Sequence, residues 1–426
     1  LAEQHETIRR DLDAGSDKPV NAFAALSMPM SPQTQLRVAR RWARDLAPSA
    51  PLASSVRTGP GTTALRVGYV SSDFREHAIA WLLAEVWERH DRTRLTTHAY
   101  SIGPRETSPL RTRIEAAFDR FVDCSGDTIE QTASRIVEDG IEVLIDLNGY
   151  TTYAKSEILA LKPAPVQISW LGYLGTLGAE WYDYVLTDRF AGPPVLQAFF
   201  TERFLYLPDC YCPSDTQRPV ASAPERAACG LPEQGLVFCC FNASYKILPA
   251  VFDVWMRLLG QVPGSVLWLA PGNAVAGANL GREARLRGVD PRRLVFAPRV
   301  SLPEHLARHV HADLFLDTAP YNAGTTANDA LFMGVPVLTC AGETMASRVA
   351  GSQLHAIGLP ELVTTSLGEY EALALALAAE PARLQAWRQR LAAHRLTHPL
   401  FDMARFTRAL DDLLLSAWEN HASPRS

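Results

Sequence analysis

Short apolar runs alternate along the chain with longer stretches that are expected to be helical. The run at 143–147 is almost continuously apolar, as in a strand buried on both faces, and a helix is expected from about Ile79. Strands that alternate with helices predict a parallel sheet covered by helices. The runs expected to form strands lie at 65–70, 97–100, 143–147, 166–170, 184–187, 237–241, 266–270, 294–296, 314–317 and 337–339.

A break rich in Pro, Cys, Ser and Ala at 208–232 separates two such alternations. We therefore expect an α/β protein with two Rossmann-like lobes and a cleft between them, the first lobe at 61–225 and the second at 226–426. Residues 1–60 are expected to form an accessory helical segment. The last helix, at about 403–418, is amphipathic and is a candidate to pack back on the first lobe.

The helical segment at the start of the chain has clear boundary signals. A polar helix is expected at 2–13. A second, arginine-rich helix begins with Ser31 as its N-cap and Pro32 at its first helical position. The Pro, Ser, Gly and Thr content of 47–63 predicts a linker. Because the chain opens at Leu1 and not at Met, we expect further sequence upstream.

Composition narrows the function classes. Hydrophobic residues make up 47% of the chain and charged residues 20%, as in an ordinary soluble enzyme. No apolar run approaches the length that crosses a bilayer, and no signal segment opens the chain, so no membrane partner is expected. A net charge of -5 argues against nucleic-acid binding by bulk electrostatics. The seven cysteines lack a pattern of zinc-binding pairs, which indicates a reducing, cytoplasmic compartment without disulfides.

Polar side chains follow the first predicted strand. A hydroxyl pair is succeeded by Asp73 and His77, and histidine is the side chain best suited to proton transfer near neutral pH. The alternative is a plain turn in which Asp73 caps the next helix. Further on, a loop with three glycines surrounds Tyr173 and would let backbone amides approach a ligand, although it could equally be an ordinary loop.

Lysine is scarce, with four residues among 41 basic ones, and Lys246 stands with Ser244 where a helix is expected to begin. A cation at a helix N-terminus suits a phosphate or diphosphate. The alternative is an ordinary solvated surface lysine.

The stretch from Asn322 through Gly324, Thr325 and Thr326 to Asp329 brings amides, hydroxyls and an acid together at another helix start. This combination also suits a phosphate, with the acid available to ribose hydroxyls. The alternative is N-capping by one of the two threonines. No Gly-Lys-Ser/Thr sequence follows, so it is not a Walker loop.

His305 and Arg308 are three residues apart on a predicted helix and share a face, where they could bracket a planar base. A metal site at His309, His311 and Asp313 is not expected, because alternate residues on a helix do not converge.

Taken together, these motifs resemble the catalytic region of the protein O-GlcNAc transferases, glycosyltransferase family 41. The resemblance extends from residue 2 to about 418. The matching segments are 66–74 with His77, 148–151, 163–167, 170–173, 183–188, 245–246, 265–269, 316–318, 324–326 with Asp329, 342–344 and 346–350.

This resemblance implies a GT-B fold, UDP-GlcNAc as donor and co-substrate, and Ser or Thr hydroxyls of proteins or peptides as acceptors. It also implies inversion at the anomeric carbon, no metal or other cofactor, and tetratricopeptide repeats upstream. Lys246 resembles the family's diphosphate-contacting lysine, Thr325 and Thr326 its phosphate-contacting pair, and Asp329 its ribose-contacting acid.

Other site residues are implied in the same way. His305 and Arg308 resemble the uracil-side residues. His77 resembles the histidine beside donor and acceptor that has been argued to be the base, and Asp73 resembles an active-site aspartate. His5 resembles another histidine proposed for the role of base.

The sequence departs from the animal enzymes at four positions near the matching motifs. Gly324 and Trp81 each stand where those enzymes have a histidine, Ala243 where they have a glutamine and Leu302 where they have a lysine. Three alternatives therefore stay open: transfer from another nucleotide sugar such as GDP-fucose, UDP binding with degenerate catalysis, and a nucleotide-sugar epimerase on the same fold.

Overall fold

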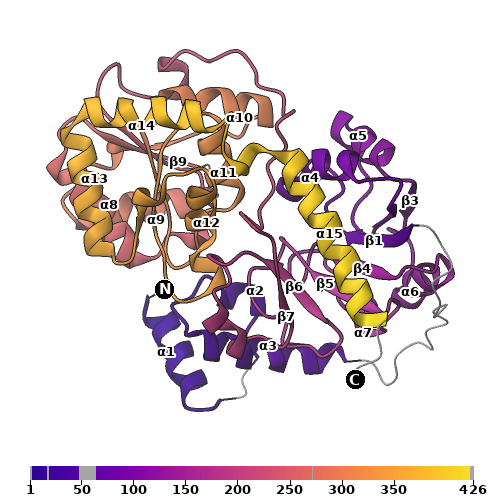
Figure 1. Ribbon diagram of the computed structural model, residues 1–426. Coiled ribbons are helices and arrows are strands. Elements are labelled where there is room, and N and C mark those ends of the chain that lie inside the picture. The colour runs from indigo at the N-terminus through magenta and orange to yellow at the C-terminus, as the bar shows by residue number, and fades with distance from the viewer. Residues whose placement is uncertain (1, 17–18, 48–63, 271, 423–426) are drawn as a thin grey trace. The chain divides into compact units, whose positions relative to one another are not determined.

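A computed structural model describes residues 2–16, 19–47, 64–270 and 272–422, and it contains two parallel β-sheets (Figure 1). The linker expected at 47–63 lies, except for residue 47, outside the described residues. The first sheet has seven strands in the order β3-β2-β1-β4-β5-β6-β7. These are β1 (Leu65–Ser71), β2 (Leu95–Ser101), β3 (Arg120–Asp123), β4 (Val143–Asp146), β5 (Val166–Ser169), β6 (Tyr184–Thr187) and β7 (Arg203–Tyr206).

The second sheet has six strands in the order β10-β9-β8-β11-β12-β13. These are β8 (Val237–Cys240), β9 (Val266–Leu269), β10 (Leu294–Phe296), β11 (Leu314–Leu316), β12 (Val337–Cys340) and β13 (Val363–Thr364). In both sheets the strand order reverses beside the first strand, as in doubly wound Rossmann-like folds. The carboxyl ends of the neighbouring parallel strands therefore meet at one edge, where ligands usually bind.

Helices connect the strands in both sheets. Those of the first half are α1 (Ala2–Asp13), α2 (Ala22–Ala25), α3 (Pro32–Leu46), α4 (Ala78–Arg89), α5 (Pro109–Ala117), α6 (Ile129–Glu138) and α7 (Glu157–Ala160). Those of the second half are α8 (Pro249–Gln261), α9 (Ala274–Leu286), α10 (Leu302–Arg308), α11 (Thr325–Phe332), α12 (Val349–Ala356), α13 (Leu367–Ala379), α14 (Pro381–His394) and α15 (Met403–Ala422). The predicted cap of α3 is confirmed, since the Ser31 side chain accepts from the Thr34 amide at 3.1 Å.

All ten predicted strands are present, with ends that shift by one or two residues. Three further strands, β3, β7 and β13, were not predicted from apolar runs. Each is the last strand at an edge of its sheet, and most residues of β3 and β7 are half-buried or exposed. An edge strand does not need a continuous apolar run, so it lacks the signal that marks a central strand such as β4, which is buried throughout.

The chain divides into two compact units. The N-terminal unit, with the seven-stranded sheet, comprises Ile8–Leu26, Met30–Thr216 and Phe401–Ser426. The C-terminal unit, with the six-stranded sheet, comprises Leu1–Thr7, Ser27–Pro29 and Gln217–Leu400. The final helix α15 thus belongs to the N-terminal unit, although it follows the second sheet in sequence.

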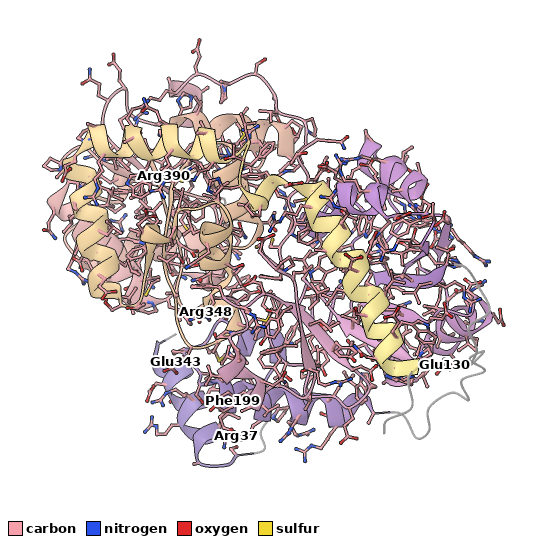
Figure 2. The ribbon with its side chains drawn as sticks, viewed as in Figure 1. Arg37, Glu130, Phe199, Glu343, Arg348 and Arg390 are labelled. Atoms are coloured by element: carbon pink, nitrogen blue, oxygen red, sulfur yellow. The ribbon has the colours of Figure 1, made fainter. Side chains whose placement is uncertain are left out.

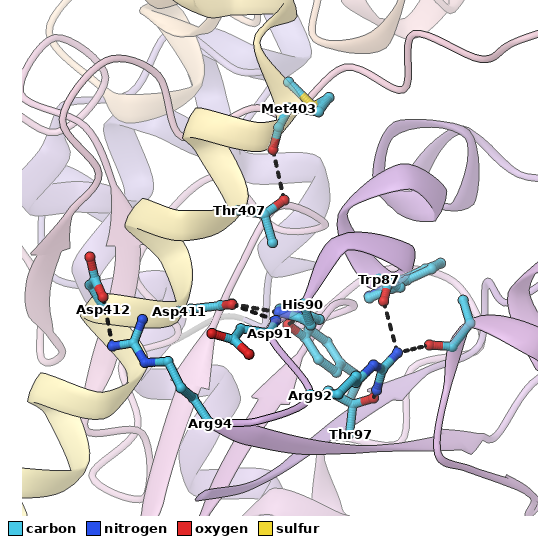
Figure 3. Close-up of polar contacts among 12 residues, drawn as sticks. Trp87, His90, Asp91, Arg92, Arg94, Thr97, Met403, Thr407, Asp411 and Asp412 are labelled. Carbon is cyan, nitrogen blue, oxygen red and sulfur yellow. Dashed lines mark hydrogen bonds and ion pairs between the residues drawn. The ribbon is translucent and has the colours of Figure 1, made fainter. Parts of the chain in front are cut away.

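A buried hydrogen-bond chain fastens α15 to the N-terminal unit (Figure 3). The Nδ1 atom of His90 lies 2.5 Å from Oδ1 of Asp411 on α15, and Nε2 of His90 lies 2.8 Å from the Tyr69 hydroxyl. The second Asp411 oxygen accepts from the Asp91 amide at 3.0 Å. Because a carboxylate can only accept, His90 donates from Nδ1 and accepts the Tyr69 proton at Nε2.

Removing the carboxylate should loosen this attachment. We expect Asp411→Ala to lower the free energy of unfolding by about 3 kcal/mol, because it leaves buried donors without an acceptor. The matched control is Asp412→Ala on the same helix, whose partner Arg94 is exposed, and it should cost about 0.5 kcal/mol or less. Urea unfolding followed by tryptophan fluorescence measures both, and equal midpoints for the two variants would contradict the role of Asp411.

No helix in the described part of the chain combines the length and the apolar character that crossing a membrane requires. The seven cysteines are all free thiols and all buried.

Candidate functional site

Three neighbouring strands of the second sheet, β8, β11 and β12, bring polar groups to one edge. Asn242 follows β8, Asp317 follows β11, and Thr339 lies in β12. All three residues are almost completely buried. Their side chains are joined by hydrogen bonds, with Asn242 Nδ2 at 3.2 Å and Thr339 Oγ1 at 2.6 Å from the Asp317 carboxylate. This polar floor supports the two segments that carry the predicted phosphate-binding residues.

Lys246 is held beside the turn that follows β11. Its ammonium donates to the carbonyl of Asn322 at 2.9 Å and lies 3.8 Å from the centre of the Tyr321 ring. Burial lowers the pKa of Lys246 to about 8, against the charge of Asp317, which raises it. The lysine was expected at a helix start, but it ends a short 3-10 turn, Ser244–Lys246, and α8 begins only at Pro249. Lys246 is therefore a cation at neutral pH whose charge is little screened by water.

The segment before α11 forms an open helix N-terminus. Gly324 occupies the N-cap position without a side-chain cap, so the alternative of N-capping by Thr325 or Thr326 is wrong. The first helical hydrogen bond runs from the Asn328 amide to the Gly324 carbonyl. The amides of Thr325, Thr326 and Ala327 precede it and have no acceptor among the described residues. A helix N-terminus with such amides is suited to bind an anion.

The two threonines of this helix start are not equivalent. The Thr326 hydroxyl donates to Oδ1 of Asn242. A hydroxyl has one proton, so in this arrangement Thr326 offers only its amide to an anion. Thr325 is half-buried, and its hydroxyl has no partner among the described residues. Thr325 is thus the threonine whose hydroxyl is available as a donor.

Asn322, which precedes α11, is hydrogen-bonded to the turn at 342–348. Asn322 is fully buried; its amide donates to the Ala346 carbonyl at 2.9 Å, and its side chain donates to the Thr318 carbonyl at 2.8 Å. The turn that carries Ala346 is closed by Arg348, which donates to the Gly342 carbonyl at 3.0 Å; Figure 2 labels Arg348 there. The carbonyl that receives Lys246 is therefore fixed from two sides.

Asp329, expected to contact ribose, forms a buried ion pair. Nη1 of Arg218 lies 2.6 Å from its Oδ1, and the Arg218 side chain is fully buried. Burial raises the pKa of Asp329 to about 6, while Arg218 acts to lower it. The second oxygen, Oδ2, lies 3.8 Å from Nε2 of His305. One oxygen is thus used by Arg218 and the other faces a histidine.

His305 and Arg308 contact each other on α10. Arg308 Nε donates to Nδ1 of His305 at 3.0 Å, so in neutral His305 the ring proton is on Nε2. Burial, followed by the charges of His309 and Arg308, lowers the pKa of His305 to about 2. The guanidinium also lies 5.0 Å from the centre of the Phe241 ring. His305 is therefore a neutral hydrogen-bond donor at Nε2, and Arg308 determines which nitrogen carries the proton.

In the N-terminal unit, Asp73 and His77 lie together at the carboxyl end of β1. The residue that caps α4 is His77, not Asp73 as the simple-turn alternative supposed, and His77 Nδ1 accepts from the Ile79 amide at 3.3 Å. Asp73 accepts from Nδ2 of Asn148 at 2.8 Å, and its Oδ2 lies 3.5 Å from His77 Nδ1. Burial lowers the pKa of His77, whereas Asp73 raises it. A proton arriving at Nδ1 would be stabilised by Asp73.

The glycine-rich loop around Tyr173 is explained by packing. A Cβ atom at Gly172 would lie 2.0 Å from the Leu147 carbonyl oxygen, and one at Gly178 would lie 2.4 Å from the Arg40 amide. The Tyr173 ring is buried, and its hydroxyl donates to the Ala22 carbonyl at 3.1 Å. These contacts favour the ordinary-loop interpretation over a ligand-binding loop.

The remaining candidates occupy separate places. Ser244 is exposed at the start of the 3-10 turn that ends in Lys246. His5 lies in α1, and its side chain is outside the described residues. Among the described residues, no three His, Cys, Asp or Glu side chains gather as a metal site would require.

Comparison with known proteins gives the family. Residues 49–222 and 214–410 match glycosyl transferase family 41. The chain belongs to glycosyltransferase family 41. It is 36% identical over 440 residues to an Arabidopsis thaliana protein named "Probable UDP-N-acetylglucosamine--peptide N-acetylglucosaminyltransferase SEC", covering 99% of this chain and 45% of that protein. It is 30% identical to the Caenorhabditis elegans UDP-N-acetylglucosamine--peptide N-acetylglucosaminyltransferase, covering 84% of this chain and 41% of that one.

Solved structures agree with the family 41 assignment. A mutant of the Thermobaculum terrenum O-GlcNAc transferase superposes with a TM-score of 0.86 at 30% identity, covering 99% of this chain and 82% of that one. An Anabaena protein solved with UDP and glucose reaches 0.55 at 11% identity, which bears on the fold alone. The predicted fold class, α/β with two Rossmann-like lobes of the GT-B type, is confirmed. This chain spans less than half the length of the Arabidopsis and Caenorhabditis relatives.

The sequence motifs missed three residues of this candidate site. Arg218 lies in the Pro- and Ser-rich break, where no pattern marks it, and Asn242 and Asp317 were read only as part of their segments. Position alone gave a signal for the last two. Asp317 directly follows the central strand β11, and Asn242 is the second residue after the central strand β8.

Proposed function

We propose that this chain transfers N-acetylglucosamine from UDP-N-acetylglucosamine to Ser or Thr hydroxyls of proteins or peptides, with inversion at the anomeric carbon. The observation that carries the proposal is the pairing of Lys246 with the open N-terminus of α11 at one sheet edge. The names of the relatives support the choice of donor and acceptor. A diphosphate leaving group gains negative charge as the sugar departs, and these groups are the donors it requires.

The donor roles follow from the geometry of the C-terminal unit. We assign the diphosphate to Lys246, the Thr325 hydroxyl and the amides of Thr325 and Thr326. Asn322 holds Lys246, and Ser244 and Gly324 border the same group. We assign the nucleoside to the neutral donor His305, to Arg308 and to Oδ2 of Asp329, the oxygen that faces His305. The missing side chain at Gly324, where a Cβ would meet only a Val349 methyl at 3.6 Å, leaves room beside the helix start.

We assign removal of the proton from the acceptor hydroxyl to His77, assisted by Asp73. His77 is expected to be neutral near pH 7 because burial lowers its pKa, so it can accept a proton. Asp73, 3.5 Å from Nδ1, would stabilise the resulting imidazolium. A second route, in which a donor phosphate or water takes the proton and His77 only positions the substrate, is separated from the first by the variants described in the Discussion.

We further propose that the reaction needs no metal or other cofactor. The fixed cation Lys246 and the α11 amides supply the stabilisation that a metal gives in other transferases. We place the protein in a reducing, cytoplasmic compartment, which the buried free thiols support.

The decisive experiment is calorimetry with UDP, GDP and UDP-N-acetylglucosamine, with and without EDTA. We expect UDP and UDP-N-acetylglucosamine to bind, GDP to bind at least about tenfold more weakly, a difference of about 1.4 kcal/mol, and EDTA to change nothing. Mass spectrometry of mixed Ser/Thr peptides should then show the N-acetylhexosamine increment. Preference for GDP would favour another nucleotide sugar. UDP binding without any modified peptide would favour a binding protein with degenerate catalysis.

A further inference from the structure

One buried carboxylate, Asp317, has no role in the assignments above. It is 1% exposed and directly follows β11. Its Oδ1 accepts from the amides of Thr318 and Ala323, both at 2.7 Å, and from Nδ2 of Asn242 at 3.2 Å. Its Oδ2 accepts from the Thr339 hydroxyl at 2.6 Å. Four donors around one carboxylate are enough to keep it ionised in an otherwise unfavourable environment.

The Asp317 carboxylate closes the turn that holds Lys246. By binding the amides at both ends of the turn, Thr318 and Ala323, it fixes the backbone between them. That backbone carries the Tyr321 ring beneath the ammonium and the Asn322 carbonyl that accepts from it. A shift of the turn would therefore move both contacts of Lys246 at once.

The same carboxylate fixes the start of α11. Asn242 donates from Nδ2 to Asp317 and, at 2.7 Å, to the Thr318 hydroxyl. These bonds point its Oδ1 outward, where it accepts from the Thr326 hydroxyl. Asp317 thus acts on Thr326 through one intermediate side chain.

Asp317 also supplies a negative charge close to Lys246. Among the described residues no basic side chain forms an ion pair with Asp317. Burial raises the pKa of Asp317 to about 6 and lowers that of Lys246 to about 8. The positive charge of Lys246 acts to lower the pKa of Asp317, and the negative charge of Asp317 acts to raise the pKa of Lys246. Between about pH 6 and 8 both groups are charged, and loss of the carboxylate charge would favour the neutral lysine.

We infer that Asp317 is the positioning residue of the diphosphate subsite, which it builds by fixing the turn under Lys246 and, through Asn242, the start of α11. This inference rests on the proposed function, because it needs a diphosphate ligand at Lys246. It assigns Asp317 no contact with the substrate.

The test is calorimetry with UDP-N-acetylglucosamine from pH 5.5 to 9.5 on the folded Asp317→Asn protein. This donor is used because its diphosphate has no proton that titrates near pH 6. Asparagine keeps the shape and removes the charge, so we expect affinity at pH 7.5 to fall about tenfold and the alkaline loss of binding to move down by about one pH unit. Asp313→Asn, at the opposite end of β11, is the matched control and should bind like wild type.

A second background tests whether the alkaline shift comes from the charge of Lys246. In Lys246→Arg protein the cation does not titrate in this range, so Asp317→Asn should weaken binding there without moving any alkaline limb. If Asp317→Asn does not fold, Thr339→Val replaces it. That variant keeps the carboxylate but removes one donor, so the acid loss of binding should move to higher pH while the alkaline limb stays in place.

The outcomes separate the two proposals. Wild-type protein that binds no UDP-N-acetylglucosamine at any pH would overturn the proposed function. Wild-type binding with unchanged pH limbs in both Asp317→Asn and Thr339→Val would overturn the role of Asp317 alone.

Discussion

Replacing Lys246 with alanine should lower kcat for sugar transfer by about 10²- to 10³-fold, the usual effect of removing one donor that stabilises a developing anion. The ammonium is half-buried, held by the Asn322 carbonyl at 2.9 Å and by the Tyr321 ring at 3.8 Å. In such a site little water is present to replace it. Initial rates with a peptide acceptor at saturating donor measure the effect.

A matched lysine separates this chemistry from a general loss of charge. Lys155 also donates to a backbone carbonyl, that of Asp127 at 3.2 Å, but it lies in the N-terminal unit. Lys155→Ala should leave kcat unchanged. Near-normal turnover in folded Lys246→Ala protein would remove the leaving-group assignment, whatever the control shows.

The same lysine predicts a pH dependence. With a pKa of about 8, Lys246 loses its proton as pH rises through that value. Activity that depends on the ammonium should therefore decline above pH 8. Lys246→Arg should abolish this alkaline decline, because the guanidinium stays charged.

The sequence was sufficient for most of the fold because the central strands carry their own signal. A run such as 143–147 has to be apolar on both faces, and it remained recognisable without any tertiary information. Edge strands such as β3 are only partly covered and carry no such constraint. The attachment of α15 through His90 and Asp411 joins residues 321 positions apart, and no local pattern encodes such a pairing.

For the site, the sequence motifs identified the correct segments, but they did not predict the role of each side chain within a segment. Thr325 and Thr326 were predicted as equivalent, yet the structure commits the Thr326 hydroxyl to Asn242. Arg218 reaches Asp329 across 111 residues. The donors to Asp317 lie in β12 and in the segments that follow β8 and β11. These contacts depend on strand order, which composition and spacing do not specify.

Replacing His77 with asparagine should lower kcat by about 10²-fold or more, within the range for a lost general base. Asparagine is preferred to alanine because its Oδ1 can still cap α4 in place of Nδ1. His77→Ala would add the loss of a helix cap, about 1 kcal/mol of stability. Because burial lowers the pKa of His77, the acid limb of the wild-type rate should lie below pH 6.5, and it should disappear in the variant.

The hydrogen bonds of His77 make its role testable in more detail. Nδ1 accepts from the Ile79 amide, so in neutral His77 the proton is on Nε2. A base acting at Nδ1 must give up that bond and gain the contact with Asp73, whereas a residue that only positions substrate would donate from Nε2. His77→Gln keeps a donor near the Nε2 position but has no basic nitrogen that could take a proton in place of Nδ1. Low activity in both His77→Asn and His77→Gln supports the base. Recovery in His77→Gln alone indicates positioning, and wild-type kcat in both would leave His77 with only the structural task of capping α4.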